Sequence, residues 1–199
     1  MHESDMEYAD YEQQCDAEAE AEGMAHEGEI IQHVKMDLIK EAESFSAIKY
    51  PCSKGVPTIG YGRTFLTDDE CKRLHVESFE SLGHITEENA EWLLSRDIER
   101  CETELTKEIP FFAMIPNDVQ IVLMDMCFNM GIKRLMKFKK MFRYIEQGDY
   151  SSASIELLDS NYASDVKGRS LRNSIALSTG KFVELEVCKQ MWKQLKRRV

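Results

Sequence analysis

The sequence predicts an α+β fold with two lobes, a small one built on a β-hairpin and a larger one made of helices. Glycine, proline and β-forming residues are concentrated in residues 45–64, directly after one helical segment. From about residue 86 onward, apolar residues recur at helical spacing between short connections. A chain of 199 residues has room for one such domain with a sizeable core.

Residues 1–28 are predicted to form an acidic tail that is disordered or loosely helical, and residues 29–199 to form the domain. Residues 1–29 contain eleven acidic residues and no Lys or Arg. Unbalanced charge with few apolar residues does not support a packed core. A solubilising tail is the simpler interpretation, and a recruiting or masking segment is the alternative.

Without this tail the chain is neutral but unevenly charged. Residues 30–118 carry a net charge of −7 and residues 119–199 a net charge of +7. This polarity could orient a charged polymer across the domain, or it could reflect a mixed solvated surface. Because there is no strong basic field, nucleic acid is not an expected partner.

The cysteines and the N-terminus indicate a reduced, cytoplasmic starting compartment. The six cysteines are scattered as single residues without CxxC or zinc-ligand spacing, so neither a metal nor a cofactor is expected. The acidic N-terminus is unlike a secretory signal. No apolar run approaches the length of about 18 residues that indicates a membrane span, so stable membrane insertion is not expected.

The first helix is predicted over residues 29–44 and the hairpin over Phe45–Thr64, with its turn near Ser53–Gly55. Later helices are predicted from a cap at Thr86, from an apolar stripe that ends at Gly131, from Leu135 to Ile145, from Ala153 to Leu158, and around Leu171–Leu177 and Val183–Leu195.

Glu43 is a candidate general acid. Glycoside hydrolysis needs a proton donor for the leaving oxygen, and a second group on the opposite face of the sugar. A carboxyl at a helix end facing a hairpin is partly buried, which suits a proton donor. Cys52 follows after eight residues and Thr58 after five more. The plainer alternatives are a solvated helix residue at Glu43, a small apolar filler at Cys52 and a β-former at Thr58.

This spacing and several motifs resemble the T4-type phage lysozymes, glycoside hydrolase family 24. The family's triad is Glu, then Asp or Cys after eight residues, then Thr after five. The similar segments are Ile39–Phe45, Tyr50–Cys52, Gly55–Gly62, Ile85–Ala90, Phe128–Gly131 and Gly148–Tyr150. The resemblance runs from about residue 29 to the C-terminus.

The resemblance implies a lysozyme-like fold and a muramidase that cleaves the β-1,4 bond between N-acetylmuramic acid and N-acetylglucosamine in bacterial peptidoglycan. It implies the following roles: Glu43 as general acid, Cys52 in the second catalytic position, Thr58 holding the attacking water, Phe128 and Asn129 lining the sugar cleft, and Arg169 paired with Glu43.

Two positions depart from the usual pattern. Arg63 replaces a histidine, and its acidic partner maps to Asp97, so we expect a structural ion pair there. At the second catalytic position, where the family has either Asp or Cys, this chain has Cys52. A thiol beside an ionised carboxylate resists ionisation, so we expect Cys52 to direct water or act as a weak base in an inverting reaction, with a retaining, nucleophilic route as the alternative.

The resemblance further implies a phage or prophage endolysin that acts as a monomer. It would start in the host bacterial cytoplasm and reach the periplasm and cell wall at lysis, through a membrane lesion such as one made by a holin. Two other functions stay open: an amidase or peptidase using Cys52 with His75 or His84 as base, and a peptidoglycan-binding module without catalysis.

Overall fold

The computed structural model describes residue 23 and residues 26–52 and 55–196. The chain divides into two units, Met1–Val34 and Lys35–Val199, and the second contains the elements discussed below. Almost all of the predicted acidic tail lies outside the described residues. Helix is assigned to residue 23 and to residues 26–43, so the first helix extends further toward the N-terminus than the predicted 29–44 and ends one residue earlier.

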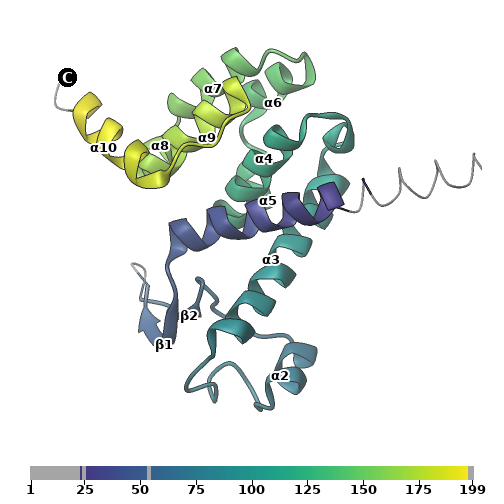
Figure 1. The fold of residues 1–199 in the computed structure, drawn as a ribbon, viewed down its shortest axis with the longest axis vertical. Helices are drawn as coiled ribbons and strands as arrows, with labels where there is room; N and C mark the ends of the chain where they lie inside the picture. Colours follow the sequence, from purple (N-terminus) through teal and green to yellow (C-terminus); the bar gives the residue numbers. More distant parts are fainter. Residues whose placement is uncertain (1–22, 24–25, 53–54, 197–199) are drawn as a thin grey trace, which may run out of the picture. The chain divides into compact units, whose positions relative to one another are not determined.

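The second unit has the predicted α+β architecture, with a two-stranded antiparallel sheet followed by a series of helices (Figure 1). The elements are β1 (Ser46–Pro51), β2 (Pro57–Gly60), α2 (Asp68–Leu74), α3 (Glu87–Glu108), the 3₁₀ turn η1 (Phe112–Met114), α4 (Asn117–Met130), α5 (Ile132–Leu135), α6 (Lys139–Glu146), α7 (Tyr150–Leu158), α8 (Asn161–Val166), α9 (Gly168–Thr179) and α10 (Leu185–Lys196).

The hairpin is seated on α3. Tyr50 lies opposite Thr58 in the ladder, and Ile59 of β2 is fully buried. A Cβ atom at Gly60 would lie 3.2 Å from the Cβ of Ala90 on α3, and Gly60 has a φ of +63°. Glycine is therefore required here both by the backbone conformation and by the close approach of the helix.

α3 and α4 form the centre of the core. Thr86 caps α3 by accepting a hydrogen bond from the Asn89 amide at 3.2 Å, as predicted. α3 leads from the hairpin and α2 toward α4, and α7, α8 and α10 pack around α9 (Figure 1). The buried stripes of the two central helices consist of Ala90, Leu93, Leu94, Ile98 and Leu105 on α3 and Val119, Val122, Leu123 and Met126 on α4.

Three features differ from the sequence expectations. The predicted helix from Leu135 to Ile145 is interrupted between α5 and α6, because the chain turns before Phe138, whose ring packs edge-on against Tyr162 with centroids 6.2 Å apart. α2 and α8 were not predicted. Both are short, and their N-terminal ends are fixed by the side-chain caps of Thr67 and Ser160 rather than by a long apolar stripe.

Within the described part of the chain, no helix is long and apolar enough to span a membrane.

Candidate active site

Glu43 is the last residue of the first helix. Ser44 follows with a φ of +60°, and its amide donates to the Lys40 carbonyl at 3.1 Å, which ends the helix before β1 begins. One turn earlier, Ile39 is fully buried and anchors this end of the helix in the core. The Glu43 side chain is 24% exposed, so its carboxyl is largely enclosed but still accessible.

Gly62 closes one side of the Glu43 carboxyl. A Cβ atom added at Gly62 would lie 3.5 Å from Glu43 Oε2, and the residue has a φ of +92°. A side chain here would be strained by the positive φ, and its Cβ atom would be in van der Waals contact with the carboxylate. The turn after β2 therefore brings bare backbone up to the helix end.

Arg169, in the first turn of α9, binds the other carboxyl oxygen. Its Nη1 donates to Glu43 Oε1 at 2.5 Å. Its Nε lies 3.0 Å from Asp125 Oδ2, and its Nη2 lies 3.0 Å from Asp125 Oδ1. The guanidinium is 7% exposed. Arg169 thus joins Glu43 to a fully buried carboxylate on α4.

Asp125 is the centre of a buried polar cluster, which we call the Asp125 cluster and define as Asp125, Arg169, Arg172 and Asn173. Asn173 Nδ2 donates to Asp125 Oδ2 at 2.7 Å, and Arg172 Nη2 lies 3.3 Å from Asp125 Oδ1. Arg172 also donates to Glu41 at 3.0 Å and to the Leu38 carbonyl at 3.3 Å. The cluster therefore ties α4 and α9 to the helix that carries Glu43.

Electrostatics keep Asp125 and Arg169 of this cluster ionised. Burial alone would raise the pKa of Asp125, but Arg169, together with Arg172 and Asn173, outweighs it and holds the pKa below its ordinary value. Burial disfavours the charged form of Arg169, but Asp125 and then Glu43 reverse this and raise its pKa. Sequence reasoning missed Asp125, although a lone acidic residue in the apolar run Ile121–Cys127 is a usable signal.

A pocket of about 240 Å³ opens beside Glu43. It is lined by Ala42, Glu43, Asn129, Val166, Arg169, Leu185 and Lys189. Asn129, a predicted sugar-cleft residue, is exposed at this pocket. Phe128 is partly buried and packs against the core, outside the lining of this pocket.

Cys52 and Thr58 lie on the hairpin, outside the lining of this pocket. Cys52 is partly buried, and its amide donates to the Val56 carbonyl at 2.9 Å. Thr58 is 3% exposed, and its hydroxyl donates to the same carbonyl at 3.0 Å. Burial raises the pKa of Tyr50, and the nearby charges of Glu43 and Cys52 raise it further. Tyr50 therefore marks where the helix end and the hairpin meet.

Comparison with known proteins identifies the family of this chain. The phage lysozyme family matches residues 40–175. The chain belongs to the phage lysozyme family. The match begins just before Glu43 and includes the hairpin, Asn129 and Arg169.

Individual relatives of this lysozyme-family chain are distant. It is 26% identical over 164 residues to a probable T4-type lysozyme 2 of Dictyostelium discoideum, covering 74% of the chain and 95% of the relative. It is 23% identical over 159 residues to a probable T4-type lysozyme 1 of the same organism, covering 72% and 93%. It is also 26% identical over 157 residues to the pre-baseplate central spike protein Gp5 of Enterobacteria phage T4. That match covers 72% of the chain but spans only 27% of the spike protein.

Membership of the phage lysozyme family supports the assignment of this chain as a muramidase-type peptidoglycan hydrolase.

In this lysozyme-family chain Arg63 is buried and pairs with Asp97, as expected, and also with Glu70. Its Nε donates to the Phe65 carbonyl at 2.8 Å. Burial would raise the pKa of Glu70, but hydrogen bonds from Thr67 and the charge of Arg63 lower it overall. These contacts join the end of the hairpin to α2 and α3.

The two histidines considered as bases for Cys52 lie outside the lining of the pocket at Glu43. His75 ends α2 in a left-handed conformation, and the backbone of His84 pairs with Ile48; both histidines are exposed. In the described ranges, no group of three or more His, Cys, Asp or Glu side chains is arranged to hold a metal ion.

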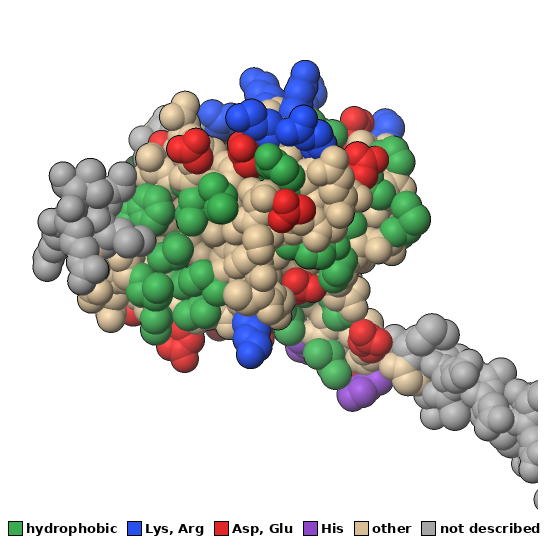
Figure 2. All heavy atoms as spheres, turned by 90° about the horizontal axis from the view of Figure 1, so that it is seen from above, with side chains coloured by type: hydrophobic (Ala, Val, Ile, Leu, Met, Phe, Trp, Pro, Cys, Tyr) green, Lys and Arg blue, Asp and Glu red, His purple; other side chains and the backbone are tan. Residues whose placement is uncertain are grey.

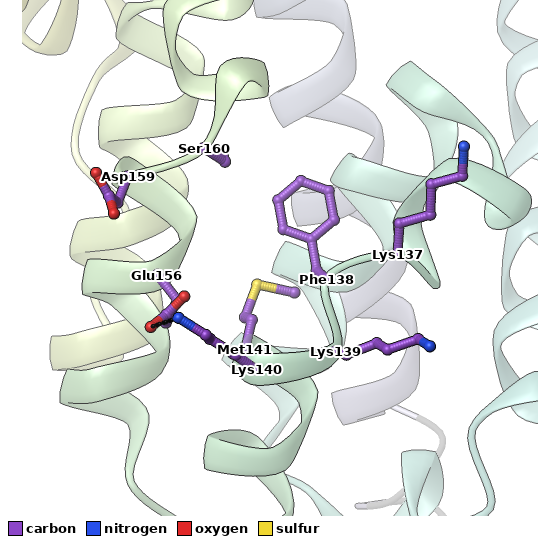
Figure 3. Close-up of a pocket in the computed structure, with 8 residues that line it drawn as sticks. All are labelled: Lys137, Phe138, Lys139, Lys140, Met141, Glu156, Asp159 and Ser160. Atoms are coloured by element: carbon purple, nitrogen blue, oxygen red, sulfur yellow. Dashed lines mark ion pairs between the residues drawn. The ribbon is translucent and has the colours of Figure 1, made fainter.

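A second, larger hollow lies on the helical lobe. Lys and Arg side chains gather along one edge of the face in Figure 2. The hollow, of about 460 Å³, is lined by Lys137, Phe138, Lys139, Lys140, Met141, Glu156, Asp159 and Ser160. Figure 3 shows Lys140 reaching toward Glu156, 3.7 Å away, while Lys137 and Lys139 point away from this pair. The hollow has both signs of charge and shares no lining residue with the pocket at Glu43.

Proposed function

We propose that this protein is a muramidase that cleaves the β-1,4 bond between N-acetylmuramic acid and N-acetylglucosamine, with Glu43 as general acid. The observation that carries the proposal is the position of the Glu43 carboxyl. It lies at a helix end, is largely enclosed but accessible, is bound by Arg169 on one oxygen, and has the bare backbone of Gly62 at the other. A proton donor for a leaving-group oxygen needs this combination of enclosure and access.

In the proposed reaction the Glu43 carboxyl gives its proton to the glycosidic oxygen as the bond from that oxygen to C1 breaks. A water attacks C1 from the opposite face, and its proton passes to solvent or, when Cys52 is a thiolate, to the Cys52 sulfur. Because the Thr58 hydroxyl donates its hydrogen to the Val56 carbonyl, its oxygen is left to accept a hydrogen bond from that water. A water held in this way keeps a lone pair free for C1.

Asn129 and Phe128 would contact the glycan. The exposed Asn129 amide opens onto the same pocket as Glu43 and can donate and accept hydrogen bonds with sugar hydroxyl or acetamido groups. Phe128 would support this wall from the core side.

We further propose that the protein acts as a monomeric phage or prophage endolysin. It would be made in the host cytoplasm and reach the wall through a membrane lesion at lysis. The relation to phage lysozymes favours this role, and the relation to a T4 central spike protein favours a tail-associated lysozyme as the second candidate. Expression in a bacterial host with and without a co-expressed holin separates the two: an endolysin lyses the culture only when the holin is present.

The enzymatic proposal is tested on purified peptidoglycan by turbidity and by release of reducing ends. Glu43→Gln should lower the rate by about 100-fold or more, since it removes the proton donor. Glu99→Gln, at an exposed glutamate on α3, is the matched control and should leave the rate unchanged. Equal lysis by wild type and Glu43→Gln would refute the assignment, and release of free amino groups in place of reducing ends would favour the amidase.

The role of Cys52 has its own test. Cys52→Asp should stay active, because a carboxylate can direct the water by a hydrogen bond and can also accept its proton. An inactive Cys52→Asp enzyme beside an active Cys52→Ala enzyme would show that this role is wrong.

A further inference from the structure

The contact between Arg169 and Glu43 raises a chemical difficulty for a general acid. An arginine that faced Glu43 alone would favour the ionised carboxylate, which has no proton to give. Arg169 remains charged, because its pKa is raised above the ordinary arginine value. Something must therefore offset this charge before Glu43 can act as the proton donor.

Asp125 is placed to do so. A guanidinium presents its donors along separate edges. Asp125 occupies the edge formed by Nε and Nη2, with contacts of 3.0–3.2 Å, and Glu43 meets Nη1 at 2.5 Å. Asp125 is fully buried, whereas Glu43 is 24% exposed. The carboxylate that neutralises Arg169 is thus permanently enclosed, and the one that would do the chemistry remains accessible.

The orientation of Asp125 is itself fixed from two sides. Asn173 donates to one oxygen at 2.7 Å, and Arg172 lies 3.3 Å from the other. Arg172 is fully buried and also binds Glu41, two residues before Glu43. Glu41 in turn accepts a hydrogen bond from the Leu185 amide at 2.7 Å. The contacts form a continuous path from Asp125 to the Glu43 helix.

The charges around Glu43 balance when it holds its proton. In the Asp125 cluster and its partner Glu41, two arginines face two carboxylates. Among the described residues, the other groups near Glu43 are Tyr50 on β1 and Tyr162 on α8, both neutral phenols with raised pKa. Lys189 on α10 lines the same pocket, and its charge is offset by Glu186, 3.7 Å away. An ionised Glu43 would add an unmatched negative charge to the buried cluster.

The Asp125 cluster contains buried polar atoms that lack a hydrogen-bond partner, which a cluster optimised for stability alone would avoid. Among the described residues, the buried side-chain polar atoms without a hydrogen-bond partner are Tyr162 Oη, Arg172 Nε and Asn173 Oδ1. Two belong to the Asp125 cluster, and Tyr162 has Asp125 and Arg169 as electrostatic neighbours. Unpaired buried polar groups are costly, and their concentration in one place is typical of a functional site.

We propose that Asp125 is a positioning residue for the glycosidase reaction, which fixes Arg169 against Glu43 and offsets its charge so that Glu43 can donate its proton. This inference rests on the proposed muramidase function. Asp125 does not touch the substrate in this account and acts only through Arg169.

The test is a kinetic comparison of Asp125→Asn with Glu70→Gln on soluble peptidoglycan fragments, below the thermal transition of both variants. Each variant removes a buried carboxylate charge that pairs with a buried arginine, but only Asp125 is connected to Glu43. Asp125→Asn should lower kcat by about 10- to 100-fold and change KM less than about twofold, because the proton donor is misplaced while glycan contacts remain. Glu70→Gln should leave both constants near wild type.

A double-mutant cycle separates positioning from general damage. On an Arg169→Gln background, Asp125→Asn should lower kcat no further, since its path to Glu43 is already broken. If Asp125→Asn fails to fold, Asn173→Ser, which removes one donor to Asp125, should lower kcat several-fold at unchanged KM.

Two outcomes overturn the proposal: an unchanged kcat in a folded Asp125→Asn enzyme, or additive losses in the cycle. Failure of the muramidase assignment looks different, because Glu43→Gln would then keep wild-type activity.

Discussion

Arg63 and Arg169 are both buried and each binds two carboxylates, yet the surroundings of these two arginines differ. Arg63 is 4% exposed and binds Glu70 and Asp97, and each of these has a further donor, the Thr67 amide for Glu70 and Arg100 for Asp97. Arg169 is 7% exposed and binds Asp125, which is fully enclosed, and Glu43, which is 24% exposed.

The difference indicates which pair is structural. Around Arg63 every carboxylate is neutralised and hydrogen-bonded within the fold, which holds the hairpin to α2 and α3. Around Arg169 the enclosed carboxylate is satisfied in the same way, but Glu43 keeps one oxygen facing the bare backbone of Gly62. A compensated cluster stabilises the fold, whereas a cluster with one accessible carboxyl can exchange a proton with a ligand.

The largest expected effect comes from removing each arginine. Arg63→Gln should cost about 3–5 kcal/mol of unfolding free energy, because it leaves the buried Glu70 carboxylate without its cation and leaves Asp97 with Arg100 alone. Its kcat should stay near wild type at temperatures where it is folded. Arg169→Gln should lower kcat by about 100-fold, because Glu43 loses its orienting partner. Urea unfolding measures the loss of stability in both variants, and initial rates measure the loss of kcat. A loss of kcat in folded Arg63→Gln as large as in Arg169→Gln would contradict a purely structural role for Arg63.

The pH dependence of stability should show both clusters. The pKa of Glu70 and the pKa of Asp125 are lower in the folded protein than their ordinary values near 4. Each group therefore stabilises the fold above its unfolded-state pKa and loses that contribution as the pH falls through its folded-state pKa. Unfolding free energies from pH 7 down to pH 3 should fall more steeply in wild type than in Glu70→Gln or Asp125→Asn. Equal slopes in all three proteins would contradict these shifts.

The smallest predicted effect concerns the glycine beside Glu43. Gly62→Ala and Gly55→Ala should each cost about 1–2 kcal/mol, because both residues have a positive φ. Only the added methyl group at Gly62 meets Glu43, since nothing lies within 4 Å of a Cβ at Gly55. Gly62→Ala should therefore lower kcat several-fold and Gly55→Ala should not. Equal rates in both variants would show that the close approach to Glu43 has no catalytic consequence.

Local patterns predicted much of the fold and the position of Glu43. The stripes on α3 and α4, the Thr86 cap and the hairpin all follow from periodicity and turn chemistry, which act over a few residues. The Asp125 cluster could not be predicted in this way. Its members come from α4 and α9 and meet residues of the first helix more than 80 positions earlier in the chain, so only tertiary packing brings them together.

Short helices and helix breaks were also not predicted from the sequence. α2 and α8 depend on single side-chain caps, and the break between α5 and α6 depends on the packing of Phe138 against Tyr162. An apolar residue at Phe138 fits a continuous helix equally well, so periodicity alone could not locate the break.

The central claim, that Glu43 protonates a glycosidic bond, is tested most directly by following the products released from peptidoglycan by NMR, with wild type and Glu43→Gln side by side. The account predicts new reducing ends on N-acetylmuramic acid, formed first as the inverted α-anomer, and none from Glu43→Gln. The same reducing ends released equally fast by Glu43→Gln, or free amino groups in their place, would contradict it.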